Sequence, residues 1–121
     1  METETMTKIK DIESALKLFE EAATKHAEAT EQGGGYKTIN KNYKLIIAAT
    51  GFLKEHNQLI LLGDFLNHPS VGVRLWAATY LLDIKKDEAA KTLIAIARSG
   101  GIHSVNAGTT LSEWKKGNLN L

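Results

Sequence analysis

The sequence of 121 residues contains no cysteine and only one proline. The absence of cysteine excludes disulfides, zinc sites with thiolate ligands and a cysteine nucleophile. There is no Asn-X-Ser/Thr sequon, and the polar amino terminus, METETMTKIK, lacks the apolar stretch of a secretory signal. The longest apolar runs, such as Leu45 to Ala49, are far shorter than the roughly 20 residues that cross a bilayer. We therefore expect a soluble, cytoplasmic protein.

The net charge is +1, but the charged residues are unevenly distributed. Residues 1–35 carry eight acidic and four basic side chains, whereas residues 36–60 carry four lysines and one acid, Glu55. Residues 61–90 are close to neutral, and residues 91–121 have a net charge of +3. No block of like charge is long enough to indicate a nucleic-acid-binding arm or a membrane-binding tract. The uneven distribution can still steer a charged partner.

Apolar residues recur at helical spacing along the whole chain, which predicts an all-α fold. Short turns between the helices indicate antiparallel hairpins in a single domain over residues 1–121. The three glycines at 33–35 predict a flexible hinge, because glycine is costly inside a helix. The predicted helices span about Thr7 to Thr30, Tyr36 to His56, Leu59 to Leu66, Val71 to Leu82, Asp87 to Arg98 and Ser104 to Lys115.

The helix predicted from Val71 to Leu82 follows a strong start signal, since Pro69 ends the preceding helix and Ser70 can cap the next. It has apolar residues on two sides, which indicates a helix enclosed at the centre of the domain. In the other helices the residues expected to face the core are Ile9, Ile12, Leu16, Phe19, Ala23 and His26; Ile39, Tyr43, Ile46, Thr50 and Leu53; Ala90, Leu93, Ile94 and Ala97; and Val105, Leu111 and Trp114.

The segment from Leu59 to Ala78 resembles a HEAT repeat, and the strongest repeat-like unit spans residues 59–84. The resemblance is carried by a leucine-rich first helix, a tight turn and a Val-Arg pair at the start of the second helix. Asparagine stands in the turn where many repeats have aspartate, which weakens any expectation of an Asp–Arg network. The matching positions are Asn67, Pro69, Val73, Arg74 and Ala77.

Residues 59–117, about half of the chain, are similar to a bacterial family of uncharacterised HEAT-like domains. The distinctive part is the carboxyl-terminal pattern of Leu111, Trp114 and Gly117. The resemblance implies a right-handed stack of helix pairs, of the HEAT/armadillo kind, with a concave side. It also implies protein binding, because small helical members of such families often act as immunity proteins (antitoxins) in bacterial competition.

No motif in the sequence indicates catalysis, a cofactor or a metal. The four histidines, His26, His56, His68 and His103, are scattered singly, so we interpret them as surface or half-buried residues. The glycines at 33–35, followed by Tyr36 and Lys37, do not have the spacing of a phosphate-binding loop. Adjacent carboxylates such as Asp87 and Glu88 point to different sides of a helix.

Binding residues can be proposed from residue type and position. Tyr36 and Tyr43 lie near the glycines and are candidates for exposure in an interface, where tyrosine is enriched. Four acidic residues, Asp64, Asp83, Asp87 and Glu88, lie near expected inter-helix turns, where helical repeats present partner contacts. In contrast, we expect Trp76, Tyr80 and Trp114 to be core or half-buried, and Arg74 to donate hydrogen bonds within the chain.

These observations predict a non-catalytic protein-binding module, specifically a cytoplasmic immunity protein that neutralises a toxin domain by direct binding. A HEAT-like adaptor or a nucleic-acid-binding domain is the alternative. In the second case Lys37, Lys41, Lys44 and Lys54 would form a basic strip, although a net charge of +1 argues against it. The sequence leaves the toxin, the binding face and the oligomeric state open.

Overall fold

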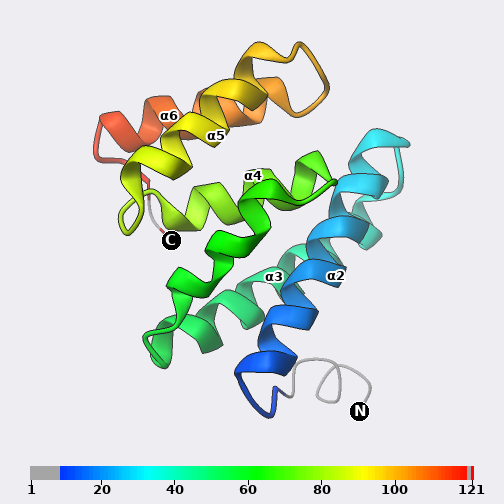
Figure 1. Ribbon diagram of the computed structural model, residues 1–121. Coiled ribbons are helices and arrows are strands. Elements are labelled where there is room, and N and C mark those ends of the chain that lie inside the picture. Colours follow the sequence, from blue (N-terminus) through cyan, green and yellow to red (C-terminus); the bar gives the residue numbers. More distant parts are fainter. Residues whose placement is uncertain (1–8, 120) are drawn as a thin grey trace. The chain divides into compact units, whose positions relative to one another are not determined.

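The structure is a computed structural model that describes residues 9–119 and 121. Within these residues it consists of five α-helices and one 3-10 helix, η1, without strands, which confirms the predicted all-α fold (Figure 1). No helix there is both long enough and apolar enough to cross a membrane. Thr7, the predicted start of the first helix, lies outside the described residues. The helices are α2 (Ile12–Glu31), α3 (Tyr36–Glu55), η1 (Leu59–Asn67), α4 (Val71–Leu81), α5 (Lys86–Arg98) and α6 (Ser104–Lys115).

The chain divides into two compact units, Met1–Leu61 and Leu62–Leu121. The first unit contains α2 and α3, the second contains α4, α5 and α6, and the boundary falls within η1. The repeat-like unit at 59–84 therefore begins in the first unit and continues into the second. The single domain expected from the sequence stays a prediction, and each unit is described by itself below.

In the first unit, α2 and α3 pack side by side as a hairpin (Figure 1). Phe19 is the one large residue on the buried side of α2, and the others are alanines, which allow the two helix backbones to approach closely. Ile12, Leu16 and His26, expected to face the core, are only half-buried. The buried residues of α2 are Ala15, Phe19, Ala22, Ala23, Ala27 and Ala29.

Asp11 starts α2 as an N-cap residue. Its Oδ1 atom accepts a hydrogen bond from the backbone N–H of Ser14 at 2.8 Å. The hydrogen bonds from Ser14 lower the pKa of the Asp11 carboxyl below its usual value of 3.8, because they stabilise the ionised form. The cap fixes where the helix begins.

The glycines between α2 and α3 form a hydrogen-bonded helix cap of the Schellman type. Gly33 has a positive φ of 67°, and its N–H donates to the carbonyl of Thr30 at 3.4 Å. The N–H of Gly34 donates to the carbonyl of Ala29 at 2.6 Å. These are the two bonds that define the motif. Where the sequence predicted a flexible hinge, the structure shows a turn with its own hydrogen bonds.

The buried side of α3 is rotated from the one predicted. Leu45, Ala49 and Asn42 are buried together with Ile46 and Leu53, whereas Tyr43 is 46% exposed. The polar residues on this side bond within the helix: the Thr50 hydroxyl donates to the carbonyl of Ile46 at 2.9 Å. The prediction of Tyr43 as a core residue is therefore wrong, and its prediction as a candidate for exposure is confirmed.

In the second unit, α5 packs against both α4 and α6. Eight of the eleven residues of α4 are buried. Leu75, Ala77 and Leu81 are 8%, 0% and 0% exposed, which confirms that α4 is shielded from solvent on more than one side. The predicted cap is also confirmed, because the Ser70 hydroxyl accepts a hydrogen bond from the N–H of Val73.

Two apolar residues predicted to face the core are instead exposed. Ile94 on α5 is 39% exposed and Val105 on α6 is 74% exposed. The buried positions of these helices are Ala89, Leu93 and Ile96 on α5, and Ala107 and Leu111 on α6.

Candidate functional site

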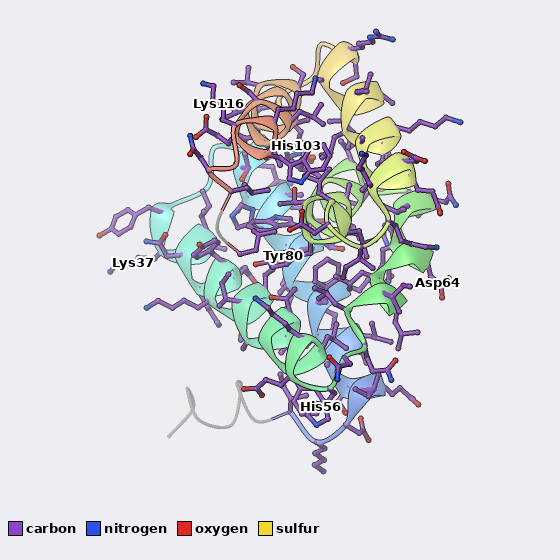
Figure 2. The ribbon with its side chains drawn as sticks, turned by 90° about the vertical axis from the view of Figure 1, so that its left-hand side faces the viewer. Lys37, His56, Asp64, Tyr80, His103 and Lys116 are labelled. Atoms are coloured by element: carbon purple, nitrogen blue, oxygen red, sulfur yellow. The ribbon has the colours of Figure 1, made fainter. Side chains whose placement is uncertain are left out.

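The histidines and carboxylates do not form a metal-binding cluster in the described part of the chain. No three of these side chains are placed there so that they could hold a metal ion. His26 and His68 are half-buried and His56 is exposed, as predicted. His103 is buried at 7% exposure, so its prediction as a surface or half-buried residue is wrong (Figure 2).

The exposed side of α3 combines large apolar or aromatic residues with lysines. Tyr36, Tyr43 and Ile47 are 71%, 46% and 42% exposed. Their spacing of seven and four residues places them in one row along the helix. Three exposed lysines lie beside this row. We call this surface the α3 basic face and define it by Tyr36, Lys37, Lys41, Tyr43, Lys44 and Ile47.

All the charged residues of the α3 basic face are lysines. The segment from Tyr36 to Lys54 contains four lysines and no acidic residue. Over residues 9–119 and 121, the ammonium groups of Lys37, Lys41 and Lys44 have no salt-bridge partner. Lys37 lies at the outer edge of α3 (Figure 2). Their positive charge is thus available to a partner molecule.

The four acidic residues proposed from the sequence all lie in the second unit and are exposed. Asp64 lies within η1, in the segment that was predicted to be helical (Figure 2). Asp83 follows α4 and accepts a hydrogen bond from the Trp114 indole N–H at 2.9 Å, which ties α6 to the turn before α5. Asp87 and Glu88 lie in the first turn of α5, and Glu88 is 3.4 Å from Lys85. The structure thus gives Asp83 and Glu88 contacts within the chain.

The second unit also contains an open pocket of about 570 Å³, between η1, α4 and α5. Its lining combines apolar side chains with the charged side chains of Arg74, Lys91 and Glu88. Of the six predicted binding residues only Glu88 lines it. We call it the unit 2 pocket. The lining residues are Gly63, Leu66, Asn67, Val71, Arg74, Glu88, Lys91, Thr92, Ala95, Ile96 and Ser99.

The remaining aromatic and arginine predictions are confirmed. Tyr80 is buried, while Trp76 and Trp114 are half-buried. The rings of Trp76 and Tyr80 stack with centroids 6.3 Å apart. Nη1 of Arg74 donates to the carbonyls of His68 and Pro69, at 2.6 Å and 3.2 Å, so this side chain holds the turn before α4.

Sequence reasoning missed Ile47 and the unit 2 pocket. Ile47 could have been found from its spacing to Tyr36 and Tyr43, which puts all three on one side of a helix. The pocket gave no sequence signal, because its lining comes from three separate elements.

Comparison of the chain with protein families, with curated proteins and with solved structures gave no match. The resemblance to HEAT-like domains therefore stays a prediction.

Proposed function

We propose that the chain is a non-catalytic protein-binding module that acts in the cytoplasm as an immunity protein and neutralises a bacterial toxin domain by direct binding. The observation that carries protein binding is the exposed row of Tyr36, Tyr43 and Ile47 on α3. Tyrosine is enriched at interfaces, because it buries a large area with few rotatable bonds and keeps a polar tip. The immunity role is added by the resemblance of residues 59–117 to HEAT-like domains.

The charge of the α3 basic face favours an acidic surface on the partner. Lys37, Lys41 and Lys44 lie along one side of the row of Tyr36, Tyr43 and Ile47, and residues 36–54 contain no acid. Opposite charge on a partner would speed the encounter and orient it, with the effect weakening as salt is added. A partner that presents a basic surface would be repelled from this helix.

Nucleic-acid binding is the second candidate, because exposed lysines interleaved with aromatic residues also occur on surfaces that bind single strands. The geometry of α3 favours it less. Tyr36 and Tyr43 are seven residues apart, which is about 10 Å along a helix and too far for stacking successive bases. Phosphate-driven binding weakens steeply with salt, so a gel shift at low and at physiological salt separates this candidate from protein binding.

Growth rescue tests the proposed function. Each protein encoded beside this chain is expressed in a sensitive strain with and without the chain, and complexes are recovered by affinity purification. One neighbouring protein should arrest growth alone, allow growth with the chain, and co-purify with it in a one-to-one complex. If no neighbouring protein is toxic, or if a toxic one neither binds the chain nor is neutralised by it, the immunity role is wrong.

A further inference from the structure

The unit 2 pocket has the size and composition of a ligand site. Its volume of about 570 Å³ lies within the range of roughly 300–1,000 Å³ that is usual for bound small molecules or peptide segments. Leu66 and Ile96, only 7% and 4% exposed, give it an apolar floor. Polar and charged groups from α4 and α5 complete the wall. A ligand that fits must therefore carry both an apolar part and a polar part.

Arg74 is the fixed polar group of this pocket. Its Nη1 atom is held by the carbonyls of His68 and Pro69. Within the described part of the chain, its Nε and Nη2 atoms have no acceptor. An arginine held in this way loses little side-chain entropy on binding, and its second edge presents two parallel N–H donors that match a carboxylate.

Lys91 adds a second positive charge from α5. It is exposed, and its ammonium group has no salt bridge to any described residue. Glu88 is the one acid in the lining. Its Oε1 atom lies 3.4 Å from Nζ of Lys85, a residue that does not line the pocket. The lining residues by themselves carry a net charge of +1, which matches an anion with one negative charge. A dianion such as phosphate would bring a second negative charge close to Glu88, which repels it.

From these observations we infer that the unit 2 pocket binds a carboxylate attached to an apolar group. Arg74 and Lys91 hold the carboxylate, while Leu66 and Ile96 contact the apolar part. A free aliphatic acid and the carboxyl-terminal residue of a peptide share this chemistry. This site is separate from the α3 basic face and does not depend on the proposed immunity role.

The test is a titration of the isotope-labelled full chain, followed by amide and arginine side-chain NMR signals. The probes are N-acetylleucine and its uncharged amide, and a hexapeptide that ends in leucine with a free or an amidated carboxyl group. The free acids should shift the signals of Arg74, Lys91 and Thr92 in a saturable way, and the amides should bind at least about tenfold more weakly, since they lose a charge-assisted contact. Tighter binding of N-acetylleucine would identify a small acid as the ligand, and tighter binding of the free hexapeptide would identify the carboxyl-terminal end of a peptide.

Lys91→Ala should weaken binding of the free acids about tenfold, while Lys86→Ala should leave it unchanged. Lys86 is the matched control because it is an exposed lysine of α5 that does not line the pocket. The test uses Lys91 because replacing Arg74 would also release the turn before α4. The inference is overturned by equal binding of acids and amides, by tighter binding of inorganic phosphate, by signals that shift elsewhere, or by equal effects of the two variants.

Discussion

The turn between α2 and α3 offers a sharp test of the structure, because two of its glycines have different roles. Gly33 has a φ of 67°, in the left-handed region that an alanine occupies at a cost of about 1–2 kcal/mol. Gly35 has a φ of −64° and a ψ of 149°, which any residue adopts, and no atom lies within 4 Å of an added Cβ. Alanine also reduces the entropy of the unfolded chain, which recovers about 0.4–1 kcal/mol at either position.

Gly33→Ala should therefore lower the free energy of unfolding by about 1 kcal/mol. Gly35→Ala should be close to neutral, because the entropic gain is offset by the loss of glycine as a helix N-cap. Gly33→Asn should fall between the two, since asparagine tolerates positive φ better than alanine. Urea denaturation followed by circular dichroism measures these differences. Equal effects of Gly33→Ala and Gly35→Ala would contradict the hydrogen-bonded cap and favour the flexible hinge.

Two further perturbations test other elements. Leu81→Ala in α4 should lower the free energy of unfolding by about 2–5 kcal/mol, because Leu81 is 0% exposed. Ile84→Ala, at a residue that is 45% exposed, should lower it by less than about 1 kcal/mol. Urea denaturation measures both values, and equal losses would contradict the enclosure of α4. The lowered pKa of Asp11 means that its contribution to stability is present above the unfolded value of 3.8 and is lost as the pH falls through the folded value. Thermal unfolding between about pH 5 and about pH 2 should therefore depend less on pH in Asp11→Asn, which keeps a cap, than in the wild type, and identical profiles would refute this role.

The positions of the helices could be predicted well from the sequence, because local signals set their ends. Ser70 caps α4 through the N–H of Val73, as its place after Pro69 predicted. The α3 helix ends just before Asn57, which has a positive φ of 56°. Such signals act within a few residues of the chain, so they can be identified without knowledge of the tertiary structure.

The buried sides of the helices were harder to predict. Val105 and Ile94 are apolar and in helical register, yet both are exposed. Small residues take the buried positions instead, for example Ala89 on α5 and Ala107 on α6. Hydrophobic periodicity gives most weight to large side chains, whereas closely packed helices bury alanine at their contact. The side of a helix that is buried is then decided by the helices that pack against it.

The candidate sites could likewise be predicted only in part from the sequence. Tyr36 and Tyr43 could be proposed from residue type and spacing, and the structure places both on the exposed side of α3. Arg74 and Lys91 are far apart in sequence and meet at one pocket only because α4 packs on α5. No local pattern connects them, so the unit 2 pocket required the structure.

The proposed contact between the α3 basic face and the partner is tested by the affinity of the partner recovered by growth rescue. Replacing Tyr36 and Tyr43 together by alanine should weaken that complex at least about 30-fold, which corresponds to about 2 kcal/mol for interface residues of this type. In the control, Ile102 and Val105 of the second unit, which are 56% and 74% exposed, are replaced by alanine in the same way. This control should change the affinity less than about twofold. Undiminished binding by the tyrosine variant, or a greater loss in the control, would show that the partner does not bind the α3 basic face.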